Sequence, residues 1–167
     1  MNDLNEQEVY LKNIKEVIEV QGFDIAETVT DKPWGAFIRL SDKNAEAFIN
    51  LYFDDIKKSF KTFDGLSPKY LIIAPDKQLS WQYHYRRAEH WRVLSGKVGV
   101  KLSNDDLLPL EASILKKGDL VQFPAQKRHR LIGLQDWGVV VEIWEHTDTK
   151  QASDEQDIVR VEDDFGR

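Results

Sequence analysis

Residues 79–91 of the chain read LSWQYHYRRAEHW and carry its most informative pattern. Gln82 and His84 are two residues apart on a predicted strand, so their side chains share one face, about 6–7 Å apart. Four residues follow His84, enough for a tight turn or a bulge, and Glu89 then opens the next predicted strand. An amide oxygen, an imidazole and a carboxylate on neighbouring strands form a donor set that suits a divalent metal ion.

A second imidazole follows further along the chain. Gly118 leads through a short strand to Pro124, and His129 opens another predicted strand. The chain has no cysteine, so disulfides and thiolate ligands are excluded and a metal site must use nitrogen and oxygen donors. Taken singly, each of these side chains would be an ordinary polar strand residue, but their combined spacing argues against that interpretation. The four predicted metal ligands are Gln82, His84, Glu89 and His129.

After Pro68 the chain consists of short strand-like runs separated by turn signals such as Ser95-Gly96. Val98, Val100 and Leu102 alternate with Gly99 and Lys101, as on a half-buried strand. Many short strands with regular turns predict a closed or sandwiched all-β fold. The predicted strands cover residues 70–74, 79–84, 89–95, 98–102, 112–115, 120–123, 129–134 and 139–144.

The first 66 residues have a different pattern. Residues 5–21 and 43–60 repeat apolar side chains at helical spacing, and Gly22 supplies a stop signal for the first segment. Residues 23–29 and 34–40 between them resemble short strands. We therefore expect two α-helices added to the β-fold, the second one packed on the outside of a sheet.

The length of the chain limits the number of domains, and its net charge limits the kinds of partner that it can bind. A chain of 167 residues suits one domain, with helices and first strands at 1–66, a barrel core at 68–146 and an acidic tail at 147–167. The pattern leaves open whether the tail is an ordered lid or a flexible end. The net charge of −6 leaves no basic surface for nucleic acid. Without a signal-peptide pattern or an apolar run of about 20 residues, the expectation is a cytoplasmic protein that does not bind membranes.

The two halves of the ligand pattern together resemble the two-part motif of the cupin family. That motif reads Gly/Pro-x5-[His/Gln]-x-His-x4-Glu-x6-Gly, followed by Gly-x5-Pro-x4-His. Asp76 stands here in place of the opening glycine, and Gln126 in place of a glycine after the proline. The resemblance implies a cupin-type double-stranded β-helix, which is a jelly-roll barrel. Cupin barrels often pair through their sheets, so the resemblance also implies a homodimer.

Further stretches resemble the type II mannose-6-phosphate isomerases in particular. In that family the cupin domain is often the C-terminal half of a bifunctional enzyme whose other half is a mannose-1-phosphate guanylyltransferase. The similar stretches are residues 79–91, Lys32-Pro33-Trp34-Gly35, His129-Arg130-Leu131 and the segment 157–167. The resemblance covers about residues 30–40 and 68–167, without the nucleotidyltransferase half, so a stand-alone cupin is expected.

The resemblance implies an enzyme that isomerises an aldose phosphate to a ketose phosphate, with mannose-6-phosphate and fructose-6-phosphate as the leading pair. The reaction would pass through an enediol(ate), with a divalent metal ion as Lewis acid. Zinc is the first expectation for the ion, and manganese, cobalt, nickel or iron are alternatives.

Two residues are candidates for the base that moves a proton between C1 and C2. Glu142 lies on an alternating strand late in the barrel, and His90 lies beside a predicted ligand. The competing interpretations are a salt-bridged surface carboxylate for Glu142 and an outward-facing structural residue for His90, because Glu89 must point inward. The candidates for binding the phosphate are Arg160, Lys32 and Arg87.

Three positions depart from the family pattern and keep a second function open. The family often has histidine where this chain has Tyr85 and Arg86, and Trp144 replaces a polar residue. The alternative is a non-catalytic cupin that keeps its metal and binds a sugar or a sugar phosphate.

Overall fold

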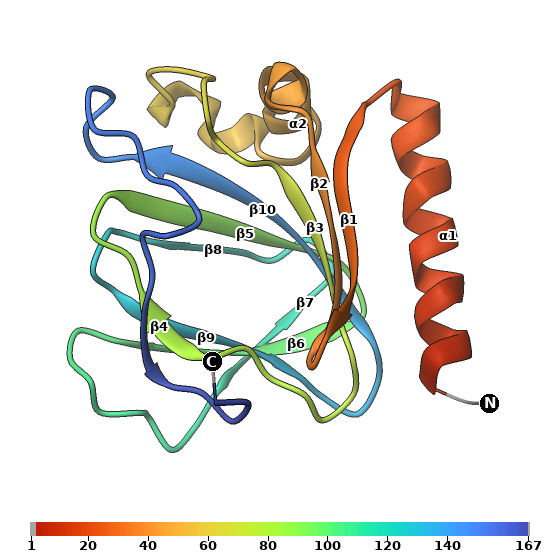
Figure 1. Ribbon diagram of the computed structural model, residues 1–167, viewed down its shortest axis with the longest axis vertical. Helices are drawn as coiled ribbons and strands as arrows, with labels where there is room; N and C mark the ends of the chain where they lie inside the picture. The colour runs from red at the N-terminus through yellow and green to blue at the C-terminus, as the bar shows by residue number, and fades with distance from the viewer. Residues whose placement is uncertain (1–2, 167) are drawn as a thin grey trace.

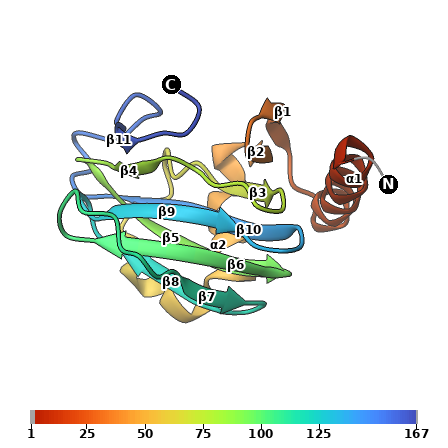
Figure 2. The ribbon, with the colours of Figure 1, turned by 90° about the horizontal axis from the view of Figure 1, so that it is seen from below.

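Two antiparallel β-sheets pack face to face in the computed structural model, which describes residues 3–166 (Figures 1 and 2). The six-stranded sheet has the order β1 (Ile25–Lys32), β2 (Gly35–Leu40), β3 (Lys69–Ile73), β10 (Gly138–His146), β5 (Arg87–Ser95) and β8 (Leu120–Phe123). The five-stranded sheet has the order β11 (Val159–Glu162), β4 (Trp81–Tyr83), β9 (Arg128–Gly133), β6 (Lys97–Ser103) and β7 (Ser113–Lys116). The expected all-β architecture with added helices in the N-terminal part is confirmed.

The first helix, α1 (Asp3–Gln21), runs beside β1 and β2 (Figure 1). It buries Leu11, Ile14 and Ile18, which follow the helical spacing seen in the sequence. Gly22 ends the helix with a left-handed backbone, φ +69°. None of the helices in the described part of the chain is long and apolar enough to cross a membrane.

The prediction of one helix over residues 43–60 is wrong. The segment forms a short 3₁₀ turn, η1 (Asp42–Asn44), the helix α2 (Ala45–Tyr52) and a second 3₁₀ turn, η2 (Asp54–Ser59). The break falls at Phe53, which leaves the helical backbone (φ −135°, ψ 28°) while its ring is fully buried. Asp54 and Asp55 then begin a new first turn, where the helix dipole favours acidic side chains. The apolar residues of the segment do repeat at helical spacing, but this spacing does not indicate the break at Phe53.

The six-stranded sheet separates two apolar layers. On its outer face, the helices pack on side chains such as Tyr70, Ile72 and Val141. On its inner face, Trp91 and Val140 pack against the other sheet. The alternation predicted for β6 is confirmed, because Val98, Val100 and Leu102 all belong to the inner layer.

The sequence left open whether the acidic tail is an ordered lid or a flexible end, and in the structure the tail packs on the barrel through β11. Its strand β11 pairs with β4, and the two segments lie side by side in both views (Figures 1 and 2). Just before β11, the Asp157 carboxylate accepts the backbone N–H groups of Tyr85 and Arg86 at 3.0 and 2.9 Å. The tail therefore fixes the loop between β4 and β5, on which the predicted ligand His84 lies.

Both positions where the motif lacks its glycine have a left-handed backbone. Asp76 has φ +55° and Gln126 has φ +67°. In this region a non-glycine residue costs about 1–2 kcal/mol, although Asp tolerates it better than most. The turn at Gln126 also serves the site, because its backbone N–H donates to the carbonyl of His84 at 2.6 Å.

Gln126→Gly should therefore raise the free energy of unfolding by about 0.5–1 kcal/mol, since relief of the strained φ exceeds the added entropy of glycine. Gln126→Val should lower it by about 1 kcal/mol, because a β-branched residue suits this φ least. Urea denaturation of the three proteins measures both changes. A glycine variant less stable than wild type would contradict this account of the turn.

Candidate metal centre and adjoining pocket

Three side chains from separate strands meet at one end of the inner layer. Glu89 of β5, His129 of β9 and His84, directly after β4, are all buried, and their ligand atoms lie within 4.8 Å of one another. His84 Nε2 is 3.1 Å from Glu89 Oε1, and His129 Nε2 is 3.6 Å from Glu89 Oε2. The structure thus brings three of the four predicted ligands into one cluster.

Gln82 lies at the edge of this cluster. It is the direct cross-strand partner of His129, so both side chains share a face. Its amide Nε2 is 3.5 Å from His129 Nε2, and its Oε1 accepts a hydrogen bond from the Ser80 hydroxyl. The Gln82 side chain thus lies beside the cluster, with its amide nitrogen toward His129 and its amide oxygen bonded to Ser80.

Both imidazoles are oriented by backbone carbonyls. His84 donates its Nδ1–H to the carbonyl of Asp157 at 2.6 Å, and His129 donates its Nδ1–H to the carbonyl of Lys127 at 2.9 Å. This arrangement leaves each Nε2 lone pair directed at the cluster, as in most histidine metal sites.

The charges of the cluster also fit a cation. Burial opposes ionisation of Glu89, but its interactions with His84 and Arg87 outweigh burial and hold the pKa of the carboxyl well below its usual value. Burial lowers the pKa of His129 to about 4, so this imidazole is neutral at pH 7. Glu89 Oε2 is buried without a hydrogen-bond partner. An ionised carboxylate with an unpartnered oxygen between imidazole nitrogens is a donor set that a divalent ion would satisfy.

A pocket of about 160 Å³ adjoins the cluster, and Gln82 and Glu89 form part of its wall. All three predicted phosphate-binding residues line it. Arg160 is exposed, whereas Arg87 is buried and donates to Glu89 Oε1, the Ser153 hydroxyl and the Asp154 carbonyl. The cationic side chains of the pocket are Lys32, Lys69, Arg87 and Arg160.

Glu142 lines the same pocket and is not a surface carboxylate. Trp91 Nε1 donates to its Oε1 at 3.0 Å, and Lys69 Nζ lies 3.5 Å from its Oε2. Burial, together with the negative charge of Glu89, raises the pKa of Glu142 to about 7. Its carboxyl group can therefore both accept and release a proton near neutral pH.

Lys69 is a pocket residue that the sequence analysis missed. Its ammonium lies 4.2 Å from the centre of the Trp144 ring, and Arg87 approaches the same ring at 3.7 Å. Lys69 also pairs with Glu155 of the tail at 3.0 Å. The available signal was the alternation of β3, which places Lys69 on the same face as the buried Leu71 and Ile73.

His90 does not belong to this site, and its assignment as a candidate base is corrected. Alternation along β5 turns it to the face opposite Glu89. Its Nε2–H donates to Glu145 Oε2 at 2.7 Å, and its Nδ1 accepts a hydrogen bond from Gln122 Nε2 at 2.9 Å. The competing interpretation of His90, as a structural residue facing away from the ligands, agrees with this placement.

Two antiparallel sheets around a buried His-Glu-His cluster define a cupin fold, and solved structures support this assignment. The capsular polysaccharide assembling protein CapF from Staphylococcus aureus matches with a TM-score of 0.54 and 18% identity, over 84% of this chain and 34% of that chain. KdgF from Halomonas sp. matches with a TM-score of 0.51 and 13% identity, over 74% of this chain and 89% of that chain. At these identities the likeness shows the fold alone.

The chain belongs to the family described as mannose-6-phosphate isomerase C-terminal, whose family model matches residues 55–163. It is 32% identical over 99 residues to the alginate biosynthesis protein AlgA of Pseudomonas aeruginosa, a match that covers 59% of this chain and 19% of AlgA. It is 29% identical over 136 residues to the xanthan biosynthesis protein XanB of Xanthomonas campestris, covering 81% of this chain and 23% of XanB. The chain thus spans about a fifth of the length of these relatives.

If the cluster holds an ion, purified protein should contain close to one equivalent of a divalent transition metal by elemental analysis. His84→Ala and His129→Ala should each abolish stoichiometric metal, because each removes an oriented Nε2 donor. His146→Ala is the control, since His146 lies outside the cluster, and it should keep its metal. Folded wild-type protein that neither contains metal nor takes it up would contradict the assignment.

In chelator-treated protein, stability should fall as the pH is lowered from 6.5 toward 4. His129 has the lower pKa in the folded state, so protons bind the unfolded chain more tightly across this range. The difference between 6.5 and about 4 corresponds to a loss of about 3 kcal/mol once the pH is below both values. His129→Gln should flatten the profile of unfolding free energy against pH between these values. Parallel profiles for the two proteins would contradict the neutral state of His129.

Proposed function

We propose that this chain is a metal-dependent isomerase that interconverts an aldose phosphate and a ketose phosphate, with mannose-6-phosphate and fructose-6-phosphate as the leading pair. The observation that carries the proposal is the pocket beside the cluster, where Glu142, with a pKa of about 7, shares the lining with the predicted metal ligands Gln82 and Glu89 and with the cationic side chains of Lys32 and Arg160. Membership of the mannose-6-phosphate isomerase C-terminal family supports the same chemistry.

The donors for the ion are His84, Glu89 and His129, with Gln82 as the fourth. A bound divalent ion supplies Lewis acidity, which stabilises negative charge on the oxygens of the sugar. Zinc suits two imidazoles and a carboxylate, and manganese, cobalt, nickel and iron accept the same donors.

Glu142 is the proposed proton carrier. Its carboxylate would take the proton from C2 of the aldose and return it to C1 of the enediol(ate), while the hydroxyl proton on O2 passes to O1, which produces the ketose. Trp91 and Lys69 hold the two carboxylate oxygens, so the group is oriented before substrate arrives. A pKa near the working pH is the value that suits a group that must accept and then donate one proton.

Arg160 and Lys32 are the proposed phosphate ligands. Neither makes an ion pair within the described residues, and both line the pocket, so their charges are available to a dianion. Arg87 is engaged differently, because its guanidinium already donates to Glu89 and to the tail. We assign Arg87 the role of positioning Glu89.

A non-catalytic cupin that binds a sugar or a sugar phosphate is the second candidate. Two observations favour it: the pocket is small, about 160 Å³, and Glu155 reaches from the tail to Lys69 at its mouth. In this alternative the tail would close over a retained ligand rather than release a product.

A coupled assay with metal-loaded protein should detect conversion of mannose-6-phosphate. Glu142→Gln should lower kcat by about 10²-fold or more with little change in KM, because it removes the proton carrier and keeps the shape of the pocket. Arg160→Ala should raise KM by about tenfold or more, as expected for loss of a charge-assisted hydrogen bond to phosphate. Arg39→Ala, which removes an exposed arginine paired with Glu27, is the matched control and should leave both constants unchanged.

The assay also separates the two candidate functions. Inactivity toward mannose-6-phosphate and toward a panel of other aldose phosphates, with metal bound, would reject the isomerase. Binding of the same sugar phosphates without turnover, weakened by Arg160→Ala, would then support the binding module.

A further inference from the structure

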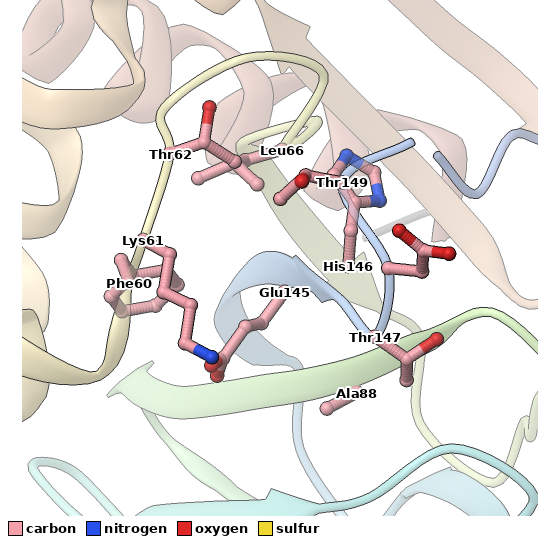
Figure 3. Close-up of a pocket in the computed structure, with 10 residues that line it drawn as sticks. Phe60, Lys61, Thr62, Leu66, Ala88, Glu145, His146, Thr147 and Thr149 are labelled. Carbon is pink, nitrogen blue, oxygen red and sulfur yellow. The ribbon is translucent and has the colours of Figure 1, made fainter. Parts of the chain in front are cut away.

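A second pocket, of about 350 Å³, lies on the other face of the six-stranded sheet (Figure 3). Trp144 of β10 pairs with Glu89 of β5 on the inner face, and the next pair along these strands is Glu145 with Ala88. Alternation therefore turns Glu145 and Ala88 outward, into this pocket. The pocket shares no lining residue with the one beside the metal cluster.

Two chain segments form the walls of this outer pocket. One is the stretch from Phe60 to Leu66, which precedes β3, and the other runs from the end of β10 to Thr149 (Figure 3). Phe60 and Leu66 are buried and, with Ala88, supply the apolar part of the lining from different sides of the pocket (Figure 3). Thr62, Thr147 and Thr149 are also part of its lining, and the Thr62 hydroxyl accepts the backbone N–H of Asp64 at 3.2 Å.

Glu145 is held in position from behind. Its Oε2 accepts the Nε2–H of His90, and His90 is fixed in turn by Gln122. Its Oε1 makes no hydrogen bond within the described residues, although the side chain is only 28% exposed. The pocket thus contains an oriented carboxylate oxygen that is free to accept a hydrogen bond.

The wall formed by His146 is equally fixed. Its Nε2–H donates to the carbonyl of Asp64 at 3.1 Å, and its Nδ1 accepts the backbone N–H of Ser153 at 3.1 Å. Both ring nitrogens are therefore used to join the two walls. A site whose walls are already joined loses little conformational entropy when a ligand binds.

The charges of the outer pocket indicate the chemical class of the ligand. Glu145 and Asp148 face a single cation, Lys61, so a phosphate or carboxylate ligand would be repelled. A carboxylate oxygen and threonine side chains instead suit a ligand with many hydroxyl groups, and the apolar residues among them suit the C–H groups of a sugar ring. We propose that this pocket binds a neutral carbohydrate of one or two sugar residues, with Glu145 accepting a hydrogen bond from one of its hydroxyl groups.

Methyl glycosides test this proposal on the metal-loaded full chain. Methyl α-D-mannopyranoside, methyl α-D-glucopyranoside and methyl β-maltoside lack a free carbonyl group, so they cannot be isomerised and the result does not depend on the proposed enzyme activity. Titration of ¹⁵N-labelled protein should shift the backbone amides of residues 61–66 and 145–149 for at least one glycoside. Glu145→Gln should weaken that binding by about tenfold or more, because it replaces a charged acceptor and retains an acceptor for His90.

Two further variants complete the test. Thr149→Val removes an exposed hydroxyl of the lining without touching the His90 contact, and it should also weaken binding. Glu16→Gln, on the exposed face of α1, should leave the affinity unchanged. Shifts confined to residues around His84 and Glu89, unchanged affinity in both lining variants, or no shift with any glycoside would overturn the proposal.

Discussion

Glu89 is an ionised carboxylate whose side chain is only 2% exposed, and most of the site is arranged around that charge. Taking a carboxylate out of water costs several kcal/mol unless nearby charges and hydrogen-bond donors compensate. Arg87 satisfies one oxygen at 2.8 Å, and the two imidazoles approach from the other sheet. The second oxygen lacks a hydrogen-bond donor, and this deficit is what a metal ion would remove. The same buried charge thus accounts both for the contacts around Glu89 and for a donor set that a divalent ion would satisfy.

The paired strands β5 and β10 present different side chains on the two faces of the six-stranded sheet. On the inner face, Glu89 and Glu142 lie close enough that the charge of one raises the pKa of the other. On the outer face, His90 donates a hydrogen bond to Glu145 and packs edge-on against Phe60. Because side chains alternate with a period of two, a substitution on one face can leave the other face intact. This separation allows the two pockets to be studied independently.

Much of the architecture could be predicted because it depends on local pattern. Strand periodicity predicted the inner layer of β6, and the spacing within residues 79–91, joined to His129 by the two-part motif, predicted that His84, Glu89 and His129 meet with Gln82 beside them. The features that were missed depend on tertiary context. The helix break at Phe53 follows from burial of its ring, and the role of Lys69 follows from carboxylates that come from β10 and the tail. His90 was misassigned because its closeness to Glu89 in sequence was weighed above the alternation of the strand.

The carbonyl that orients His84 belongs to Asp157, 73 residues further along the chain. At about 5–20 residues per second, a ribosome needs about 4–15 s to add that stretch. During this interval β4 and the loop after it have been made, yet the imidazole has no fixed tautomer and Arg87 has neither of its partners in the tail. Contacts this distant in sequence also form slowly in a free chain. The arrangement of the two imidazoles and Glu89 is therefore a property of the finished fold, completed only after synthesis has passed Asp157.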